Sequence, residues 1–164
     1  MKNVLRNIKG FSMIEVLVVV LIIGVLAAVM VPGYEKSSEK SNVAEATIGL
    51  RAIETAAREK FMVNRALFET SSLADIGVVL TNGEMDSDGQ WVTKNWTFGI
   101  SGDSTKWTAF ANRNTGDYRL TSAISPNSRN SGLITGHRCS TKKTSIGRYV
   151  CKYIESNGWT YKDS

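Results

Sequence analysis

The chain has 164 residues, of which 42% are hydrophobic and 21% are charged, and its formal net charge is +5. This size and composition fit one membrane anchor with one modest globular domain, rather than two soluble domains. Three basic residues precede residue 10, and without them 17 basic residues stand against 15 acidic ones, a net charge of +2. So small an excess argues against a sequence-specific nucleic-acid partner.

The N-terminus combines a short basic segment with a long apolar one. The first ten residues contain three basic residues and end in glycine: Lys2, Arg6, Lys9 and Gly10. The apolar run from Phe11 to Val31 carries one charged residue, Glu15. At 1.5 Å per residue, a helix of these 21 residues is about 32 Å long and can cross a bilayer core. Because basic flanks stay on the cytoplasmic side, we expect residues from 33 onward to be exported.

Three other interpretations of this stretch are weaker. A secretory signal peptide has an apolar core of about 7 to 15 residues and a small-residue cleavage site, which Leu26-Ala27-Ala28 imitates only weakly. A plain signal anchor explains the length, but not the carboxylate at Glu15 or the glycine before Phe11. A buried core helix is the third alternative. Ionised groups at the centre of a spanning helix cost about 2.5 to 3.5 kcal/mol, and less near its ends, so Glu15 needs a partner.

The N-terminal segment resembles the signature of type IV pilins and of the pseudopilins of type II secretion. The residues that carry the resemblance are Lys9-Gly10-Phe11-Ser12-Met13-Ile14-Glu15, the apolar run from Val16 to Val31, Pro32 and Tyr34. The resemblance implies that a prepilin peptidase cleaves between Gly10 and Phe11 and N-methylates Phe11. It also implies that Glu15 pairs with the Phe11 amine of a neighbouring subunit.

The same resemblance implies the partners and the location of the chain. These are a homopolymer of identical subunits, the prepilin peptidase, an inner-membrane assembly platform and the membrane itself. The helix would first serve as a single-pass inner-membrane anchor. It would later form the core of a filament in the periplasm or at the cell surface.

Three residues within or after the apolar run bear on helix packing. Gly24 and Ala28 have the small-xxx-small spacing that permits close approach of helices in lipid, although ordinary helix composition explains them equally well. Pro32 lacks a backbone donor and clashes with the carbonyl four residues back. We therefore expect the helix to kink or loosen between Gly24 and Gly33.

After Pro32 the pattern remains helical but becomes amphipathic. Apolar residues recur at spacings of three and four, at Val43, Ala46, Leu50, Ile53 and Ala57, and charged residues, Glu39 and Glu54 among them, are expected on a solvated face. Glu54 and Arg58 are spaced as an i,i+4 ion pair. The two patterns together predict one helix from Phe11 to about Phe61. The predicted organisation is a leader (1–10), a transmembrane or filament-core helix (11–32), its amphipathic half (33–62) and a globular head (63–164).

Residues 64–90 form a connector with a turn signal at Asn82-Gly83. Asp86-Ser87-Asp88-Gly89 begins like a calcium loop, so Asp86 and Asp88 are candidate calcium ligands. The downstream bidentate acid of such loops is missing, and an Asp-Gly turn explains the residues without an ion. No other cofactor is expected.

From Trp91 onward, alternation replaces the helical period. Three strands are predicted, centred on Trp96-Phe98-Ile100, Trp107-Ala109-Ala111 and Tyr118-Leu120-Ile124. Turns at Gly102-Asp103 and at residues 114–117 would connect them. The predicted fold class is α+β, with an antiparallel sheet packed on the amphipathic half of the long helix.

Cys139 and Cys151 both fall in the part expected to be exported, where disulfides persist, and we predict that they are bonded. The closed loop of 13 residues would stabilise the head by roughly 3 kcal/mol. In type IV pilins, a similar disulfide-bounded C-terminal region lies on the filament surface.

Signals for catalysis are absent from the sequence. His137 is the only histidine and is expected to be exposed, there is no Gly-x-Ser-x-Gly or P-loop motif, and the cysteines lack Cys-x-x-Cys spacing. We therefore predict a structural protein and not an enzyme: a pilus (fimbrium) subunit serving adhesion, motility or DNA uptake. The alternatives are a type II secretion pseudopilin and a membrane-anchored binding module that never polymerises. The C-terminal cysteine pair favours the pilin.

Overall fold

The computed structural model of the chain describes residues 10–126 and 133–163. The chain divides into two compact units, residues 1–37 and residues 38–164, and each is described by itself. Most of the leader, residues 1–9, lies outside the described residues.

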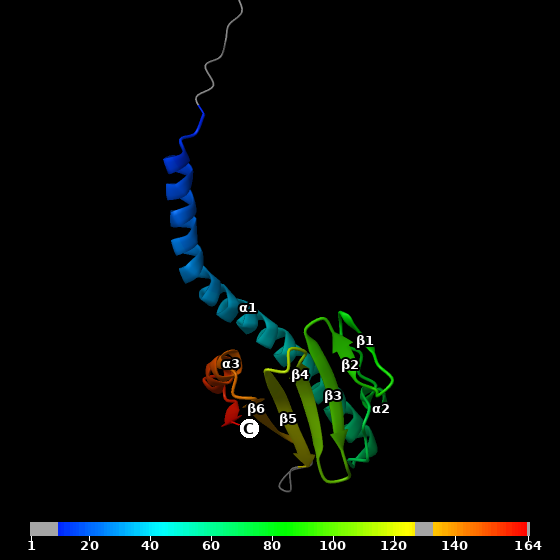
Figure 1. Ribbon diagram of the computed structural model, residues 1–164. Helices are drawn as coiled ribbons and strands as arrows, with labels where there is room; N and C mark the ends of the chain where they lie inside the picture. The colour runs from blue at the N-terminus through cyan, green and yellow to red at the C-terminus, as the bar shows by residue number, and fades with distance from the viewer. Residues whose placement is uncertain (1–9, 127–132, 164) are drawn as a thin grey trace, which may run out of the picture. The chain divides into compact units, whose positions relative to one another are not determined.

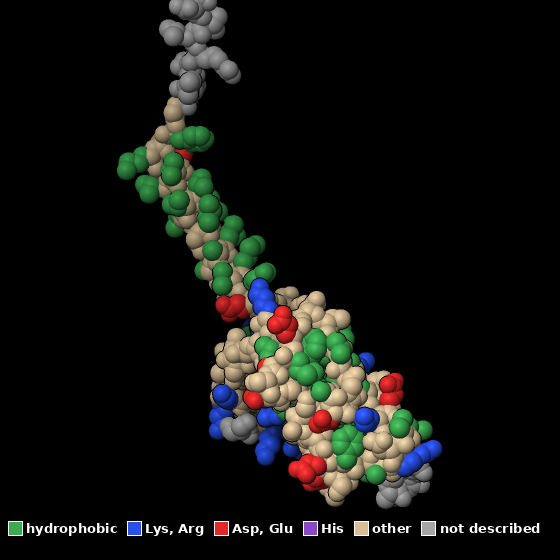
Figure 2. Space-filling model, turned by 90° about the vertical axis from the view of Figure 1, so that its right-hand side faces the viewer, with side chains coloured by type: hydrophobic (Ala, Val, Ile, Leu, Met, Phe, Trp, Pro, Cys, Tyr) green, Lys and Arg blue, Asp and Glu red, His purple; other side chains and the backbone are tan. Residues whose placement is uncertain are grey.

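The first element is the long helix α1, Met13–Asn64, close to the predicted span of 11 to about 61. It begins after Ser12 and is helical through Pro32 and Gly33. Its end has a local cause: Arg65 adopts a left-handed φ of 58° and donates its N–H to the Phe61 carbonyl at 2.7 Å. Within the first unit, apolar side chains lie along most of the visible length of the helix (Figure 2).

The second unit places a sheet on the rest of α1 (Figure 1). Its strands are β1 (Gly83–Met85), β2 (Trp91–Thr93), β3 (Trp96–Gly102), β4 (Trp107–Arg113), β5 (Tyr118–Pro126), β6 (Leu133–Thr141) and β7 (Thr160–Asp163). They lie side by side in chain order. Neighbours are antiparallel except β7, which runs parallel to β6 after the helix α3 (Ser145–Glu155). The predicted α+β fold is confirmed.

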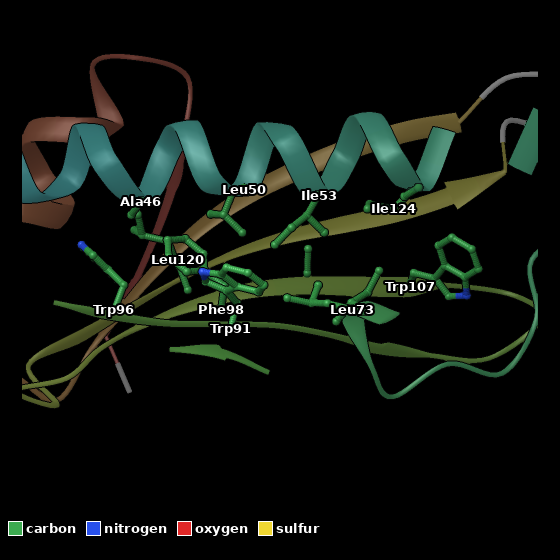
Figure 3. Close-up of a cluster of buried hydrophobic side chains, with 14 of the residues drawn as sticks. Ala46, Leu50, Ile53, Leu73, Trp91, Trp96, Phe98, Trp107, Leu120 and Ile124 are labelled. Carbon is green, nitrogen blue, oxygen red and sulfur yellow. The ribbon is translucent and has the colours of Figure 1, made fainter. Parts of the chain in front are cut away.

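The core lies between one face of α1 and one face of the sheet (Figure 3). The apolar helix positions predicted from the spacing are all buried: Val43, Ala46, Leu50, Ile53 and Ala57. They face the inward residues of the predicted strands, among them Trp96, Phe98, Leu120 and Ile124. A Cβ on Gly49 would lie only 2.5 Å from the Phe98 ring, so the absence of a side chain there lets the helix come close to the sheet.

The predicted connector contains structure that the sequence pattern did not reveal. It holds the short helix α2 (Leu73–Ile76) as well as β1. Ser72 and Asp75 form a reciprocal capping box at the start of α2, and Gly77 closes it with a left-handed φ of 71°. Leu73 and Ile76 are buried, so this turn completes the core.

Candidate assembly site

The apolar stem, residues 11–31, has no cover within the first unit. Sixteen large apolar side chains between Phe11 and Val31 are 49–87% exposed. Among the described residues, α1 is the one helix long and apolar enough to cross a membrane. Leaving such side chains in water forgoes about 1.5 to 3 kcal/mol each, so the stem requires an apolar environment.

Glu15 is part of the helix cap at the start of the stem. Its Oε2 accepts the Ser12 backbone N–H at 2.7 Å, and the Ser12 hydroxyl oxygen accepts the Ile14 N–H at 3.3 Å. This arrangement follows from the Ser-x-x-Glu spacing, a capping-box pattern. Besides the predicted pairing with a neighbouring subunit, Glu15 therefore has a role within its own subunit, because the carboxylate stabilises its own helix end.

The capping contact leaves Glu15 able to accept further hydrogen bonds. A carboxylate has two oxygens and about four acceptor sites. Among residues 10–126 and 133–163, no donor bonds to Oε1. Phe11, Glu15, Val16 and Val19 line one shallow hollow of about 270 Å³, so the carboxylate and the residue after Gly10 lie on the same patch. The structure thus brings together two of the residues predicted for processing and assembly.

The predicted packing residues lie further along the stem. Apart from the adjacent backbone of its own helix, nothing lies within 4 Å of the position that a Cβ on Gly24 would occupy, so a second helix could approach there. Ala28 is one turn further on and is exposed. The backbone is helical from residue 24 to residue 33, and the expected kink or loosening at Pro32 stays a prediction.

The second unit holds its part of α1 to the sheet by a polar cluster. Arg113 donates from Nη2 and Nε to the two carboxylate oxygens of Glu39 at 2.8 and 3.2 Å, and the Tyr118 hydroxyl donates to Oε2 at 2.8 Å. Burial opposes ionisation of Glu39, but these hydrogen bonds prevail and hold its pKa below the ordinary value. Burial, followed by the Glu39 carboxylate, raises the pKa of Tyr118.

A second cluster corrects three predictions. Glu54 is 8% exposed, and its Oε1 accepts the Ser122 hydroxyl at 2.5 Å and lies 2.7 Å from Nε2 of His137. Glu54 therefore does not belong to a solvated face and is not paired with Arg58. The expected exposure of His137 is also wrong, since its side chain is 31% exposed and its ring centre lies 4.9 Å from that of Trp159.

The prediction for Glu39 is corrected in the same way, because this residue was also expected on the solvated face of the helix. Its position could have been found from the helix period. Glu39 precedes Val43 by four residues and Glu54 follows Leu50 by four, so both lie on the buried stripe.

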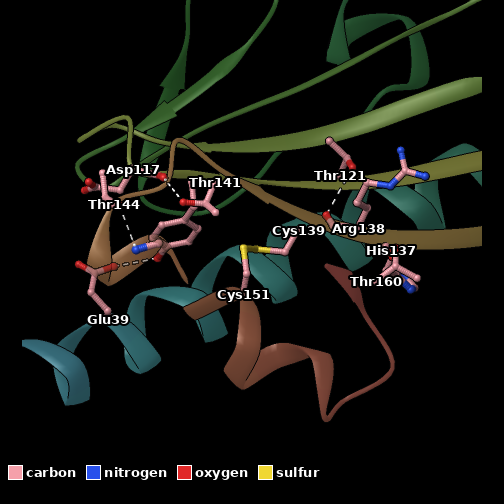
Figure 4. Close-up of a disulfide and its surroundings, with 12 residues drawn as sticks. Glu39, Asp117, Thr121, His137, Arg138, Cys139, Thr141, Thr144, Cys151 and Thr160 are labelled. Atoms are coloured by element: carbon pink, nitrogen blue, oxygen red, sulfur yellow. Dashed lines mark hydrogen bonds between the residues drawn. A yellow bond between two sulfur atoms is a disulfide. The ribbon is translucent and has the colours of Figure 1, made fainter. Parts of the chain in front are cut away.

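The cysteines are joined as predicted (Figure 4). Cys139 on β6 and Cys151 on α3 are bonded with Cα atoms 5.4 Å apart, and both are fully buried. The bond closes α3 onto the strand that precedes it. It thereby fixes the segment from which β7 returns to pair with β6.

The candidate calcium ligands lie in a tight turn between β1 and β2. Oδ1 of Asp86 accepts the N–H groups of Asp88 and Gln90 at 3.0 and 2.8 Å. Gly89 follows with a left-handed φ of 72°, which glycine adopts readily. No group of three histidine, cysteine or acidic side chains in the described residues is arranged to hold a metal.

The fold and the stem define a class of protein: an α+β head carried on a helix with an exposed apolar stem.

Residues 5–31 match the family model described as "Prokaryotic N-terminal methylation motif". The chain is 33% identical over 67 residues to a fimbrial protein of Pseudomonas aeruginosa, covering 41% of this chain and 44% of the relative. It is 43% identical over 56 residues to the type IV major pilin protein PilA of Myxococcus xanthus, covering 34% and 25%.

A third relative is the type IV major pilin protein PilE1 of Neisseria gonorrhoeae, 35% identical over 54 residues and covering 33% of each chain. The chain spans about half the length, or less, of the curated relatives it matches. No solved structure matches it significantly. The residues from Lys9 to Tyr34 predicted this similarity to type IV pilins, and the matching motif and the relatives confirm the similarity. These relatives are named as pilin or fimbrial proteins and not as enzymes.

Proposed function

We propose that the chain is a structural subunit of a type IV pilus filament. It is synthesised as a prepilin, cleaved between Gly10 and Phe11 by a prepilin peptidase, and N-methylated on Phe11. The support is the methylation motif over residues 5–31 together with relatives named as pilins and fimbrial proteins.

The observation that carries the proposal is the uncovered stem. Its sixteen exposed apolar side chains need lipid before assembly and the stems of other subunits after it. The stem is long enough for a single pass of the inner membrane, with the head in the periplasm and later on the surface filament. The open space beside Gly24 gives a site for close packing of neighbouring stems.

Glu15 supplies the polar step of assembly. Once Phe11 becomes the N-terminus, its amine carries a positive charge that a carboxylate of the neighbouring subunit can neutralise. Two charges 4 Å apart attract by about 4 kcal/mol at an effective dielectric constant of 20, against about 1 in water. Because the Ser12 N–H occupies only Oε2, Glu15 can accept from the amine without giving up its cap.

Two other functions are consistent with the same apolar stem. A pseudopilin would be processed in the same way and assembled on a secretion platform, and a binding module would stay anchored as a monomer. The disulfide-closed C-terminal region supports the pilus subunit. Adhesion, motility and DNA uptake are the roles that the family resemblance implies for such a filament.

Processing is tested by mass spectrometry of the mature protein, which should begin with N-methyl-Phe11. A Gly10→Val variant should remain an uncut precursor in the membrane, because a peptidase must approach the backbone closely there. An N-terminus created after Ala28, or an intact leader on assembled protein, would overturn the proposal. Shearing of surface filaments containing the chain separates the pilus subunit from both alternatives.

A further inference from the structure

The solvent-facing side of the sheet carries a set of cations. Arg119, Ser140 and Lys162 lie directly opposite one another on β5, β6 and β7. Directly opposed residues share a face, and Arg138 joins the same face two residues before Ser140. Cys139 points to α3, whereas Arg138 points away from it (Figure 4). We call this surface the cationic face.

No acid lies on the outward positions of the described parts of β3 to β7. Apart from the cations, these outward positions hold only small, polar or apolar residues. Within residues 10–126 and 133–163, no ion pair joins Arg119, Arg138 or Lys162 to a carboxylate. The acid nearest to Arg119 along the chain, Asp117 in the turn before β5, accepts the Thr115 hydroxyl at 2.5 Å. In the described part of the unit, the three cations of this face therefore have no ion-pair partner.

Arg119 is held in place by stacking rather than by an acid. Its guanidinium carbon lies 4.3 Å from the centre of the Phe110 ring. The Phe110 ring in turn rests on Gly99, where a Cβ would collide with it. Stacking leaves the edge of the guanidinium, with its five N–H donors, open to a ligand.

A hollow of about 480 Å³ adjoins Arg119 at the end of the strands. Its lining includes the polar side chains of Asn112, Ser140 and Lys142. All three can donate hydrogen bonds, so the hollow suits carboxylate or sulfate oxygens.

We propose that the cationic face binds an acidic polysaccharide, a chain of sugars bearing carboxylates or sulfates. The cations come from three adjacent strands about 5 Å apart, which suits charges repeated along a polymer better than one small anion. Single-stranded nucleic acid needs free aromatic faces for stacking, and the Phe110 ring is covered by Gly99 and Arg119. A flat sheet face also cannot enter the groove of a duplex.

The binding goes beyond the proposed structural role and does not need a filament, so it is tested on the full-length chain in detergent. The probe is polygalacturonate, with neutral dextran and a single-stranded oligonucleotide of equal charge as comparisons. The test variant is Arg119→Gln with Lys162→Gln. The matched control is Lys94→Gln with Lys106→Gln, which removes the same charge from turns at the ends of β3, away from the cationic face.

Wild-type protein should bind polygalacturonate and not dextran, and added salt should weaken the binding. The test variant should bind about tenfold more weakly, a loss of about 1.4 kcal/mol, while the control stays within about twofold. Near-ultraviolet circular dichroism verifies folding, and Arg138→Gln replaces the double variant if that variant misfolds. Equal loss in test and control variants, no binding to polygalacturonate, or tighter binding to the oligonucleotide would each overturn the proposal.

Discussion

The pairing of Glu15 with a neighbouring Phe11 amine can be separated from its role as a helix cap. Glu15→Gln keeps an oxygen that can accept the Ser12 N–H, but it removes the charge. If the charge pairs in assembly, the loss of about 4 kcal/mol per subunit lowers subunit association by about a thousandfold. If only the cap matters, the cost stays within about 1 kcal/mol, about fivefold.

The assay is the amount of sheared surface filament relative to membrane-inserted protein, in cells that lack the wild-type copy. Glu15→Gln should be processed and inserted, since removal of a lipid-buried charge makes insertion easier, yet it should yield no filaments. Ser12→Ala is the matched control. It removes the hydroxyl that caps Ile14 and leaves the carboxylate, so it should assemble nearly as wild type. Filaments at the wild-type level from Glu15→Gln would refute the pairing.

Three further predictions concern the head. Because the pKa of Glu39 is lowered in the folded state, its stabilising effect is present above about pH 4.5 and is lost as the pH falls through the folded value. Glu39→Gln should flatten this acid branch of the unfolding curve measured by tryptophan fluorescence, and an unchanged branch would contradict the assignment. Non-reducing peptide mapping should join Cys139 to Cys151, and replacing both by alanine should lower the free energy of unfolding by about 3 kcal/mol. Free thiols in exported protein would exclude that bond. Glu54→Ala should cost about 1 to 3 kcal/mol in denaturant melts because it leaves the buried Ser122 hydroxyl without its acceptor. A cost below 0.5 kcal/mol, as for an ordinary surface change, would count against the cluster.

The spacing of apolar residues predicted the helix and the central strands, because burial of one face imposes that spacing directly. Every apolar position assigned to the helix stripe is buried, and so are Trp96, Trp107 and Leu120 on the strands. The cysteine pair was also predictable, since its two members are close in sequence and expected outside the cytoplasm.

The buried acids were missed because charge was taken as a sign of exposure. Glu39 is half-buried and Glu54 is buried, and each has a partner distant in sequence, Arg113 and Ser122, opposite it on the sheet. Such pairing depends on strand register, which hydropathy does not encode. Hydropathy also did not reveal α3 and β7. The pairing of β7 with β6 depends on how the chain returns to the sheet after Cys151.

The two outermost strands of the sheet are both short, β1 with three residues and β7 with four. An edge strand exposes unpaired N–H and C=O groups to which a strand of another molecule can add, and a short edge offers few of them. When many heads are crowded along one membrane, accidental sheet-to-sheet pairing therefore has little to start from. In the proposed filament, association then rests on the exposed apolar stems.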